Sequence, residues 1–199
     1  MKIALLLSGG VDSSVALARL VSSGEHDITA YYLKIWLEEE FSFLGECPWE
    51  EDLDYARKVC EKFGVPLKVV SLQTAYWDLV VKHIITELKK GLTPSPDILC
   101  NQRVKYGAFT DFIDDSFDKI ASGHYARVES TPEGYILKKG IDPVKDQTYF
   151  LSHLSQKQLS RCLFPLGDLT KNQVRQLALA VTFMNHYCLI ILLLVAQIS

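Results

Sequence analysis

The sequence predicts an α/β protein in which helices flank a parallel β-sheet, and two patterns carry this prediction. Short apolar runs alternate with segments in which apolar residues recur every three or four positions. The first apolar run, residues 3–7, contains no polar side chain, as expected of a strand buried on both faces. Because right-handed crossovers join such strands, their carboxyl ends meet at one edge, where ligands bind.

The first strand leads into a glycine turn and a helix. Residues 8–10, Ser-Gly-Gly, let the backbone turn sharply and leave no Cβ in the way of a ligand. Helical spacing then joins Val11, Val15, Ala18 and Val21, and Gly24 is placed to end the helix.

Later segments continue the alternation. Strands are expected over residues 29–36, 67–72 and 118–121. Helices are expected from the spacing of three sets of residues: Leu53, Ala56, Val59 and Phe63; Trp77, Val80, Ile84 and Leu88; and Val104, Ala108 and Phe112.

Breakers and caps mark the connections. Residues 41–49 are expected to be irregular, and the two prolines in residues 93–97 predict an extended loop. A hairpin is expected to turn at Pro132-Glu133-Gly134. Ser155 with Gln158, and Thr170 with Gln173, have the spacing of capping boxes, so short helices are expected to begin there.

Composition bounds the class of protein. A chain of 199 residues fits one domain, or one domain and a fragment. The net charge of −3 provides no general attraction for nucleic acid, so any RNA contact requires a local basic patch. Five cysteines without a C-x-x-C pair argue against a disulfide framework and a zinc ribbon, and indicate a reducing compartment. No targeting peptide is recognised before the first strand.

The turn after the first strand has the chemistry of a phosphate site. Backbone N–H groups and the helix dipole favour an anion there, and the Ser8 and Ser13 hydroxyls add donors. Asp12 would repel a bare phosphate, which suggests a bridging Mg²⁺. The alternative is an ordinary strand–turn–helix with small residues for packing. The loop matches neither G-x-x-x-x-G-K-[ST] nor G-x-G-x-x-G.

A second informative segment runs from Pro94 to Lys105. It places Asp97 three residues before Cys100, at the expected start of a helix. A helix N-terminus lowers a thiol pKa, and nearby Arg103 and Lys105 would add to that effect. Cys100 is therefore a candidate nucleophile, with Asp97 as a base or orienting group. A buried structural cysteine is an equally good interpretation of the spacing.

Four motifs together resemble a known family. The loop Ser-Gly-Gly-Val-Asp-Ser is similar to the pyrophosphate loop of the N-type ATP pyrophosphatases. With it, in order, come the Pro94–Lys105 segment, Ala121-Ser122-Gly123-His124-Tyr125 and the stretch from Asp142 to Leu151. The set resembles the tRNA-specific 2-thiouridylases, bacterial and organellar enzymes that thiolate the wobble uridine, at position 34. The resemblance covers residues 2 to about 180.

This resemblance implies a Rossmann-like fold of the adenine nucleotide alpha hydrolase type, and it implies roles for named residues. ATP phosphates would be bound by Ser8, Gly9, Gly10, Val11, Asp12 and Ser13, with Leu33 and Gly123 lining the nucleotide site. The target base would be met by Ser95, Pro96 and Asp97. The tRNA would be contacted by His124, Lys145, Asp146 and Gln147. Cys100 would be one of two catalytic cysteines. Taken singly, each of these residues also has an ordinary structural interpretation.

The implied reaction uses ATP and Mg²⁺. The uridine 2-carbonyl oxygen attacks the α-phosphate, pyrophosphate leaves, and sulfur arrives as a cysteine persulfide. The implied partners are tRNA and a persulfide donor, either a cysteine desulfurase or a relay protein, and no membrane. The implied location is the bacterial cytoplasm or an organelle.

The resemblance ends after residue 180. We expect a catalytic domain over residues 1–160, the start of a truncated second domain over 161–180, and a divergent apolar tail over 181–199. Cys188 lacks the family's surrounding loop, so it is not assigned the second catalytic role, and the chain is expected to be truncated and weakly active or inactive. Two alternatives remain: an ATP pyrophosphatase that amidates or adenylates a small molecule, and a non-catalytic module that binds ATP or tRNA.

Overall fold

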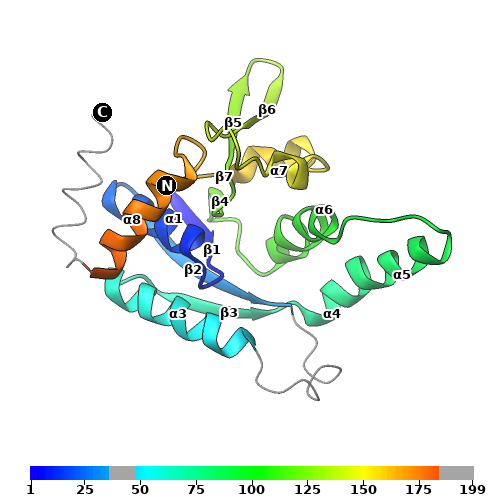
Figure 1. Ribbon diagram of the computed structural model, residues 1–199, viewed down its shortest axis with the longest axis horizontal. Helices are drawn as coiled ribbons and strands as arrows, with labels where there is room; N and C mark the ends of the chain where they lie inside the picture. The colour runs from blue at the N-terminus through cyan, green and yellow to red at the C-terminus, as the bar shows by residue number, and fades with distance from the viewer. Residues whose placement is uncertain (36–47, 184–199) are drawn as a thin grey trace.

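The computed structural model describes residues 1–35 and 48–183, and in them the predicted parallel sheet is present (Figure 1). The strands are β1 (Lys2–Leu6), β2 (Asp27–Lys34), β3 (Leu67–Ser71), β4 (Lys119–Ala121) and β7 (Cys162–Leu163). They lie in the order β3-β2-β1-β4-β7, and every neighbouring pair is parallel. The chain runs outward from β1 to β3 and then returns to β4 on the other side of β1. A crevice for a ligand is expected where this order reverses.

The central strand explains why the first apolar run carries no polar residue. Successive side chains of a strand point to opposite faces of the sheet. Ile3 and Leu5 accordingly belong to one apolar core, and Ala4 and Leu6 to the other. All four are less than 9% exposed, so the strand is buried from both sides.

Two groups of helices cover these faces (Figure 1). One core is closed by α1 (Val11–Ser22), α3 (Pro48–Phe63) and α8 (Lys171–Phe183). The other is closed chiefly by the segment from α6 (Pro96–Leu99) to the 3₁₀ turn Ala108–Asp111, and by α7 (Gln156–Arg161). The sequence-predicted domain boundaries at 160 and 180 stay predictions, while β7 and α8 join the same sheet and core as the residues before them.

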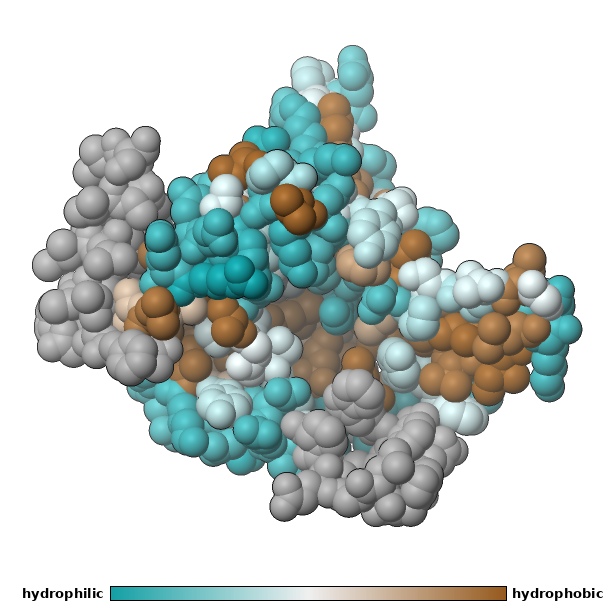
Figure 2. All heavy atoms as spheres, viewed as in Figure 1, coloured by the Kyte–Doolittle hydropathy of each residue, from teal (hydrophilic) through white to brown (hydrophobic). Residues whose placement is uncertain are grey.

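A helical arm extends from the sheet edge at β3. It consists of α4 (Gln73–Tyr76), a π-helical turn (Trp77–Val81) and α5 (Lys82–Lys89), and agrees with the predicted helix. Figure 2 shows brown apolar surface over this arm, where Leu79, Ile85 and Leu88 are exposed. No described helix has both the length and the apolar character needed to cross a bilayer.

The helix predicted through Val104, Ala108 and Phe112 is wrong. Helical structure from α6 continues as a π-helical segment, Cys100–Lys105, and stops there. A Cβ on Gly107 would lie 2.3 Å from the carbonyl oxygen of Arg103, so the backbone folds back at a point only glycine permits. Phe112 follows the next 3₁₀ turn and is 57% exposed.

Three other boundaries differ from the predictions. The loop expected over residues 93–97 ends at Ser95, because Pro96 is the first residue of α6, where proline's missing N–H costs nothing. Of the irregular segment 41–49, residues 41–47 lie outside the described part, whereas Pro48 and Trp49 already belong to α3. The strand predicted to residue 36 ends at Lys34, and residue 36 itself is not described.

The hairpin and both capping boxes are confirmed. Strands β5 (Ala126–Thr131) and β6 (Gly134–Lys139) pair antiparallel around the expected turn. The side-chain amide of Gln156 exchanges two hydrogen bonds with the backbone of Tyr135, at 2.7 and 3.0 Å. Ser155 caps α7 with Gln158, and the Thr170 hydroxyl and the Gln173 amide make the same reciprocal pair of bonds at α8.

Candidate functional site

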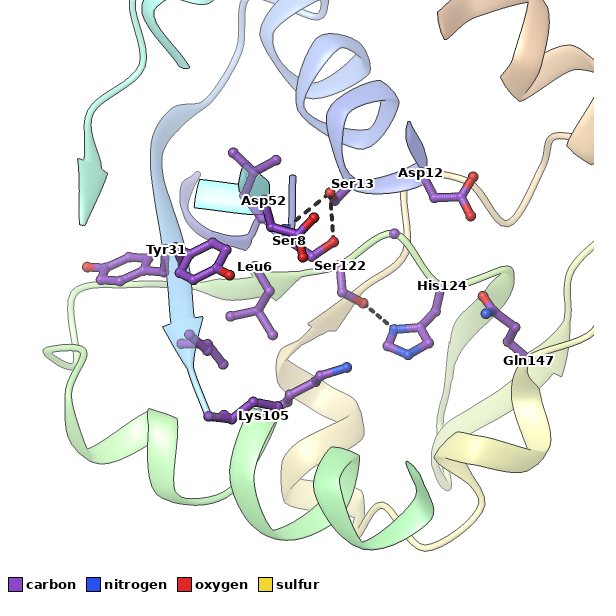
Figure 3. A pocket seen from close by; sticks show the side chains of 15 residues that line it. Leu6, Ser8, Asp12, Ser13, Tyr31, Asp52, Lys105, Ser122, His124 and Gln147 are labelled. Atoms are coloured by element: carbon purple, nitrogen blue, oxygen red, sulfur yellow. Dashed lines mark hydrogen bonds between the residues drawn. The ribbon is translucent and has the colours of Figure 1, made fainter. Parts of the chain in front are cut away.

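A cavity of about 330 Å³ opens outside the carboxyl ends of β1, β2 and β4, where the strand order reverses (Figure 3). Its lining comes from six separate parts of the chain: Leu6, Leu7, Ser8, Asp12, Ser13, Tyr31, Tyr32, Leu33, Ile35, Asp52, Lys105, Ser122, Gly123, His124 and Gln147. Aromatic and aliphatic side chains from the end of β2 form one wall, and polar groups from the turn after β1 form another.

The turn after β1 presents an open helix end to this cavity. Gly10 is the N-cap of α1 in an extended conformation, and no side chain caps the helix. The first intrahelical bond runs from Ser14 N–H to Gly10 O, at 3.1 Å, so the amides before it have no partner within the helix. The Ser8 and Ser13 hydroxyl oxygens lie 3.2 Å apart beside them. This arrangement suits an anionic group.

Two glycines allow three backbone segments to close around the turn. Gly9 has a φ of +78°, and a Cβ there would lie 2.1 Å from the carbonyl oxygen of Asp52 in α3. A Cβ on Gly123 would lie 2.9 Å from the backbone nitrogen of Ser13. Any side chain at either position would therefore push neighbouring backbone away from the helix end.

Asp12 is engaged on the side away from the two serines. Its carboxylate accepts a hydrogen bond from Tyr125 Oη at 2.9 Å and forms an ion pair with Lys171 of α8. Figure 3 shows it directed away from Ser8 and Ser13. Burial, and then the charge of Asp12, raises the pKa of Tyr125. The phenol therefore stays protonated and donates a hydrogen bond to the carboxylate.

The structure provides few protein ligands for a metal ion here. Across residues 1–35 and 48–183, no group of three or more His, Cys, Asp or Glu side chains is arranged to hold one. A Mg²⁺ ion at Asp12 would therefore take most of its oxygen ligands from phosphates and water, as Mg²⁺ commonly does. That contact stays a prediction.

His124 is held by a chain of hydrogen bonds through two buried hydroxyl groups. Its Nδ1 lies 2.7 Å from Ser122 Oγ, which lies 2.8 Å from Tyr106 Oη. Burial, and then the nearby Lys105 ammonium, lowers the pKa of His124 to about 3. The imidazole is therefore neutral at physiological pH.

The loop after β6 contributes Gln147 to the cavity and leaves its neighbours outside. Gln147 Oε1 accepts from the backbone N–H of Tyr125 at 3.2 Å. Asp146 pairs with Lys139 at 3.0 Å, and its hydrogen bonds from Thr148 hold its pKa at about 2. The backbone N–H of Lys145 donates to Asp142 at 2.7 Å. Lys145 and Asp146 thus belong to a fixed loop beside the cavity, not to its lining.

The structure favours one of the two interpretations of Cys100, the buried cysteine. It is 7% exposed, in the apolar core, and does not line the cavity. Burial raises the pKa of its thiol; Lys105 opposes this rise, and Asp97 adds to it. The guanidinium of Arg103 donates instead to Leu79 O, at 2.8 Å. The predicted low-pKa thiolate is therefore wrong for this conformation, because desolvation outweighs the helix end and the lysine.

The predicted site residues divide into three groups. Those that line the cavity are Ser8, Asp12, Ser13, Leu33, Gly123, His124 and Gln147. Those that complete the turn behind it are Gly9, Gly10 and Val11. Those that lie elsewhere are Ser95, Pro96, Asp97, Cys100, Lys145 and Asp146; Ser95 is the N-cap of α6, and Pro96 and Asp97 form its exposed start. All the assigned roles stay predictions.

Sequence reasoning missed several lining residues. They are Leu6, Leu7, Tyr31, Tyr32, Ile35, Asp52, Lys105 and Ser122. Leu6, Leu7 and Ile35 sit at the carboxyl ends of predicted strands, so the edge rule for parallel sheets was a usable signal for them. Tyr31 and Tyr32 lie within the strand predicted over residues 29–36. Lys105 was considered only for its effect on Cys100, and nothing local in the sequence marks Asp52.

A known protein family matches most of the chain. The family model described as the tRNA methyl transferase HUP domain matches residues 1–187. A solved structure, a predicted subunit of tRNA methyltransferase from Methanocaldococcus jannaschii, is similar with a TM-score of 0.52 and 17% identity. The match covers 89% of this chain and 74% of that one, and at this identity it supports the fold alone.

Curated relatives are more similar in sequence. Proteins named tRNA-specific 2-thiouridylase MnmA are 47% identical over 173 residues in Akkermansia muciniphila and 45% identical over 185 residues in Ruthia magnifica. These matches cover 86% and 92% of this chain, but 48% and 50% of the relatives. The chain thus spans about half the length of the curated relatives it matches.

Proposed function

This chain belongs to the tRNA methyl transferase HUP-domain family, and from that premise we propose that it uses ATP to activate a uridine of tRNA for 2-thiolation. One observation carries the proposal: an uncapped helix end, closely approached by Gly123, opens into a cavity at the reversal of the sheet order. The name shared by the relatives, tRNA-specific 2-thiouridylase, supports tRNA as the substrate and thiolation as the outcome.

The nucleotide occupies the cavity with its phosphates at α1. Free amides at the start of α1 and the hydroxyls of Ser8 and Ser13 bind phosphate oxygens. The apolar wall at the end of β2, including Leu33, receives the adenine base. Asp12 would hold a Mg²⁺ ion, which supplies positive charge against the phosphates when bound.

The first chemical step is adenylation of the base. The C2 carbonyl oxygen of the wobble uridine, position 34, bonds to the α-phosphorus as the bond to the bridging oxygen breaks. That electron pair leaves with pyrophosphate, and the uridine loses its N3 proton. The loop amides and hydroxyls stabilise the charge that develops on the phosphates.

The second step replaces the adenylated oxygen with sulfur. The outer sulfur of a persulfide, supplied by a donor protein, bonds to C2 as the bond from C2 to the AMP oxygen breaks and AMP leaves. The thiolate of Cys100, one of two cysteines required, then attacks the inner sulfur. The S–S bond breaks, its electron pair stays on the sulfur bonded to C2, and a disulfide joins Cys100 to the cysteine that carried the persulfide. Ser95, Pro96 and Asp97 hold the target base, with Asp97 as base or orienting group. His124, Lys145, Asp146 and Gln147 contact the tRNA. The base must leave its stack to be reached, so a stiff segment at the edge of the site is suited to receive it.

Pyrophosphate release tests the proposal directly. The chain is incubated with ATP, Mg²⁺ and either tRNA or a panel of small carboxylates, and pyrophosphate is measured. We expect release that depends on tRNA and that falls at least about a hundredfold in Gly123→Ala, because the new Cβ displaces the helix end. Gly64→Ala is the control, since a Cβ there meets nothing within 4 Å. Release driven by a carboxylate instead would identify an amidating synthetase, and ATP binding without release would identify a binding module.

A further inference from the structure

Lys105 is the cation of the cavity lining. It is the last residue of the π-helical segment, Cys100–Lys105, and it enters the site from the side opposite α1. Figure 3 shows its side chain reaching across the cavity, with the ammonium on the side of His124. Among the lining residues that the structure describes, no other lysine or arginine is present, and His124 is neutral at physiological pH.

The ammonium of Lys105 has no protein partner among the described residues. Neither a hydrogen bond nor an ion pair is formed by its Nζ within residues 1–35 and 48–183, although the side chain is half-buried. Lys171, the nearby lysine of α8, is by contrast committed to Asp12. A partly desolvated ammonium without a counter-charge is unfavourable, so the position favours an anionic ligand.

The π-helical turn determines where this ammonium lies. The N–H of Tyr106 donates to Asn101 O at 3.0 Å, five residues back. A bond of this kind widens the turn and brings residues five apart toward the same side of the helix, which for this segment means Cys100 and Lys105. The charge of Lys105 lowers the pKa of both His124 and Cys100, consistent with an ammonium between the cavity and the cysteine.

We propose that Lys105 binds the α-phosphate of the nucleotide from the wall opposite the turn at residues 8–13. The inference rests on the proposed function. If the end of α1 holds the outer phosphates, the α-phosphate lies nearer the helix from which the target base approaches. A lysine on that helix faces the α-phosphate both before and after pyrophosphate has left. Lys105 therefore serves AMP as well as ATP, whereas the outer-phosphate contacts of the α1 end serve only ATP.

Binding titrations separate Lys105 from the loop. Adenosine, AMP and ATP, each with Mg²⁺, are titrated by calorimetry into the wild-type chain, Lys105→Met and Lys105→Arg. We expect Lys105→Met to weaken AMP and ATP binding at least tenfold and to leave adenosine unchanged, with Lys105→Arg within threefold of wild type. Lys89→Met, at the exposed end of α5, is the matched control and should bind all three ligands normally.

The titrations can contradict the role of Lys105 and the proposed function separately. If Lys105→Met binds AMP and ATP as the wild type does, the role of Lys105 is overturned while the proposed function stands. If it weakens adenosine equally, Lys105 shapes the pocket and does not bind phosphate, and the inference also fails. If the wild-type chain binds no ATP, the proposed function falls and this inference falls with it. Lys105→Gln, which keeps a polar side chain, repeats the test should the methionine variant unfold.

Discussion

The turn at residues 8–13 and the helix that carries Cys100 border the same cavity, but they are prepared for chemistry to different extents. The turn presents helix-end amides that have no partner among the described residues, and the Ser8 hydroxyl beside them, while the Ser13 hydroxyl donates to Gly10 O at 2.9 Å. The helix offers Lys105, while its cysteine is buried with a raised pKa. The wall proposed to bind phosphate is therefore already formed, whereas the proposed nucleophile is not accessible from the cavity.

The cause of this difference is the way each wall is held. The turn is fixed by backbone contacts that only Gly9 and Gly123 allow, so its backbone amides are held in place. The cysteine is fixed by apolar packing, which removes it from solvent and from the cavity. On the proposed function, we expect nucleotide binding to precede chemistry at Cys100, and the α6 segment to move before its thiol reacts.

The largest effect on ATP binding and stability is expected when a Cβ is added at Gly9 in the turn. Gly9→Ala combines a positive φ with a Cβ 2.1 Å from Asp52 O, so we expect ATP binding to be lost and the free energy of unfolding to fall by about 3 kcal/mol or more. Calorimetric ATP titration and denaturant unfolding measure both. Gly24→Ala is the control, with a φ of +67° and nothing within 4 Å of its Cβ, and should cost only about 1 kcal/mol. Equal losses in the two variants would mean that the turn is not specially constrained.

Two serines compare the hydrogen-bonded cluster beside the cavity with the start of α6. Ser122→Ala leaves the buried Tyr106 hydroxyl and His124 Nδ1 without their shared partner, which should cost about 2–3 kcal/mol in unfolding free energy. Ser95→Ala, at the start of α6, should cost less than about 0.5 kcal/mol, because its side chain makes no capping bond. Urea unfolding of both variants checks the contrast, and a reversed order would contradict it.

The pH dependence of stability probes His124. Its pKa is about 3 in the folded chain against an ordinary 6.5, so the unfolded state binds the extra proton between these values. Stability is therefore full above about pH 6.5 and falls as the pH drops, by about 2 kcal/mol from pH 7 to pH 5. In His124→Gln, the free energy of unfolding should no longer fall between pH 7 and pH 5, as measured by unfolding curves across this range. An unchanged slope in the variant would assign it to other groups.

The smallest expected effect concerns the exposure of Cys100 when ligands bind. In the free chain, iodoacetamide should modify Cys100 slowly, because burial raises its pKa. Addition of ATP and tRNA should raise its rate at least tenfold, about 1.4 kcal/mol in local opening. Mass spectrometry of the peptides reports each cysteine. Cys162, 3% exposed with a pKa raised to about 12, is the internal control. If neither ATP nor tRNA changes the rate at which iodoacetamide modifies Cys100, the cysteine is structural.

The sequence was most informative where short segments determine their own geometry. The apolar run of β1, the glycines after it and the capping pairs at Ser155 and Thr170 act over a few residues, and the structure has each of them. The parallel arrangement of the sheet was also predicted from the alternation of strands and helices, whereas the order of its strands was not.

The remaining features depend on contacts between distant segments. Spacing alone did not reveal that Cys100 would be buried, because its neighbours in the core come from other elements. The break at Gly107 reflects a close backbone approach, which a helical period does not encode. Strand β7 has only two residues, too few for any pattern, and Lys105 reaches the cavity through a π turn that no periodicity predicts.

The amide of Gln156 bears on how this chain behaves in solution. By donating to and accepting from Tyr135, it occupies the outer backbone groups of β6 next to the hairpin turn, as a neighbouring strand would. A free strand edge invites pairing with another molecule and, at high concentration, aggregation. One glutamine side chain thus takes the place of a neighbouring strand at Tyr135, and we expect it to disfavour pairing of this part of the edge with a second copy.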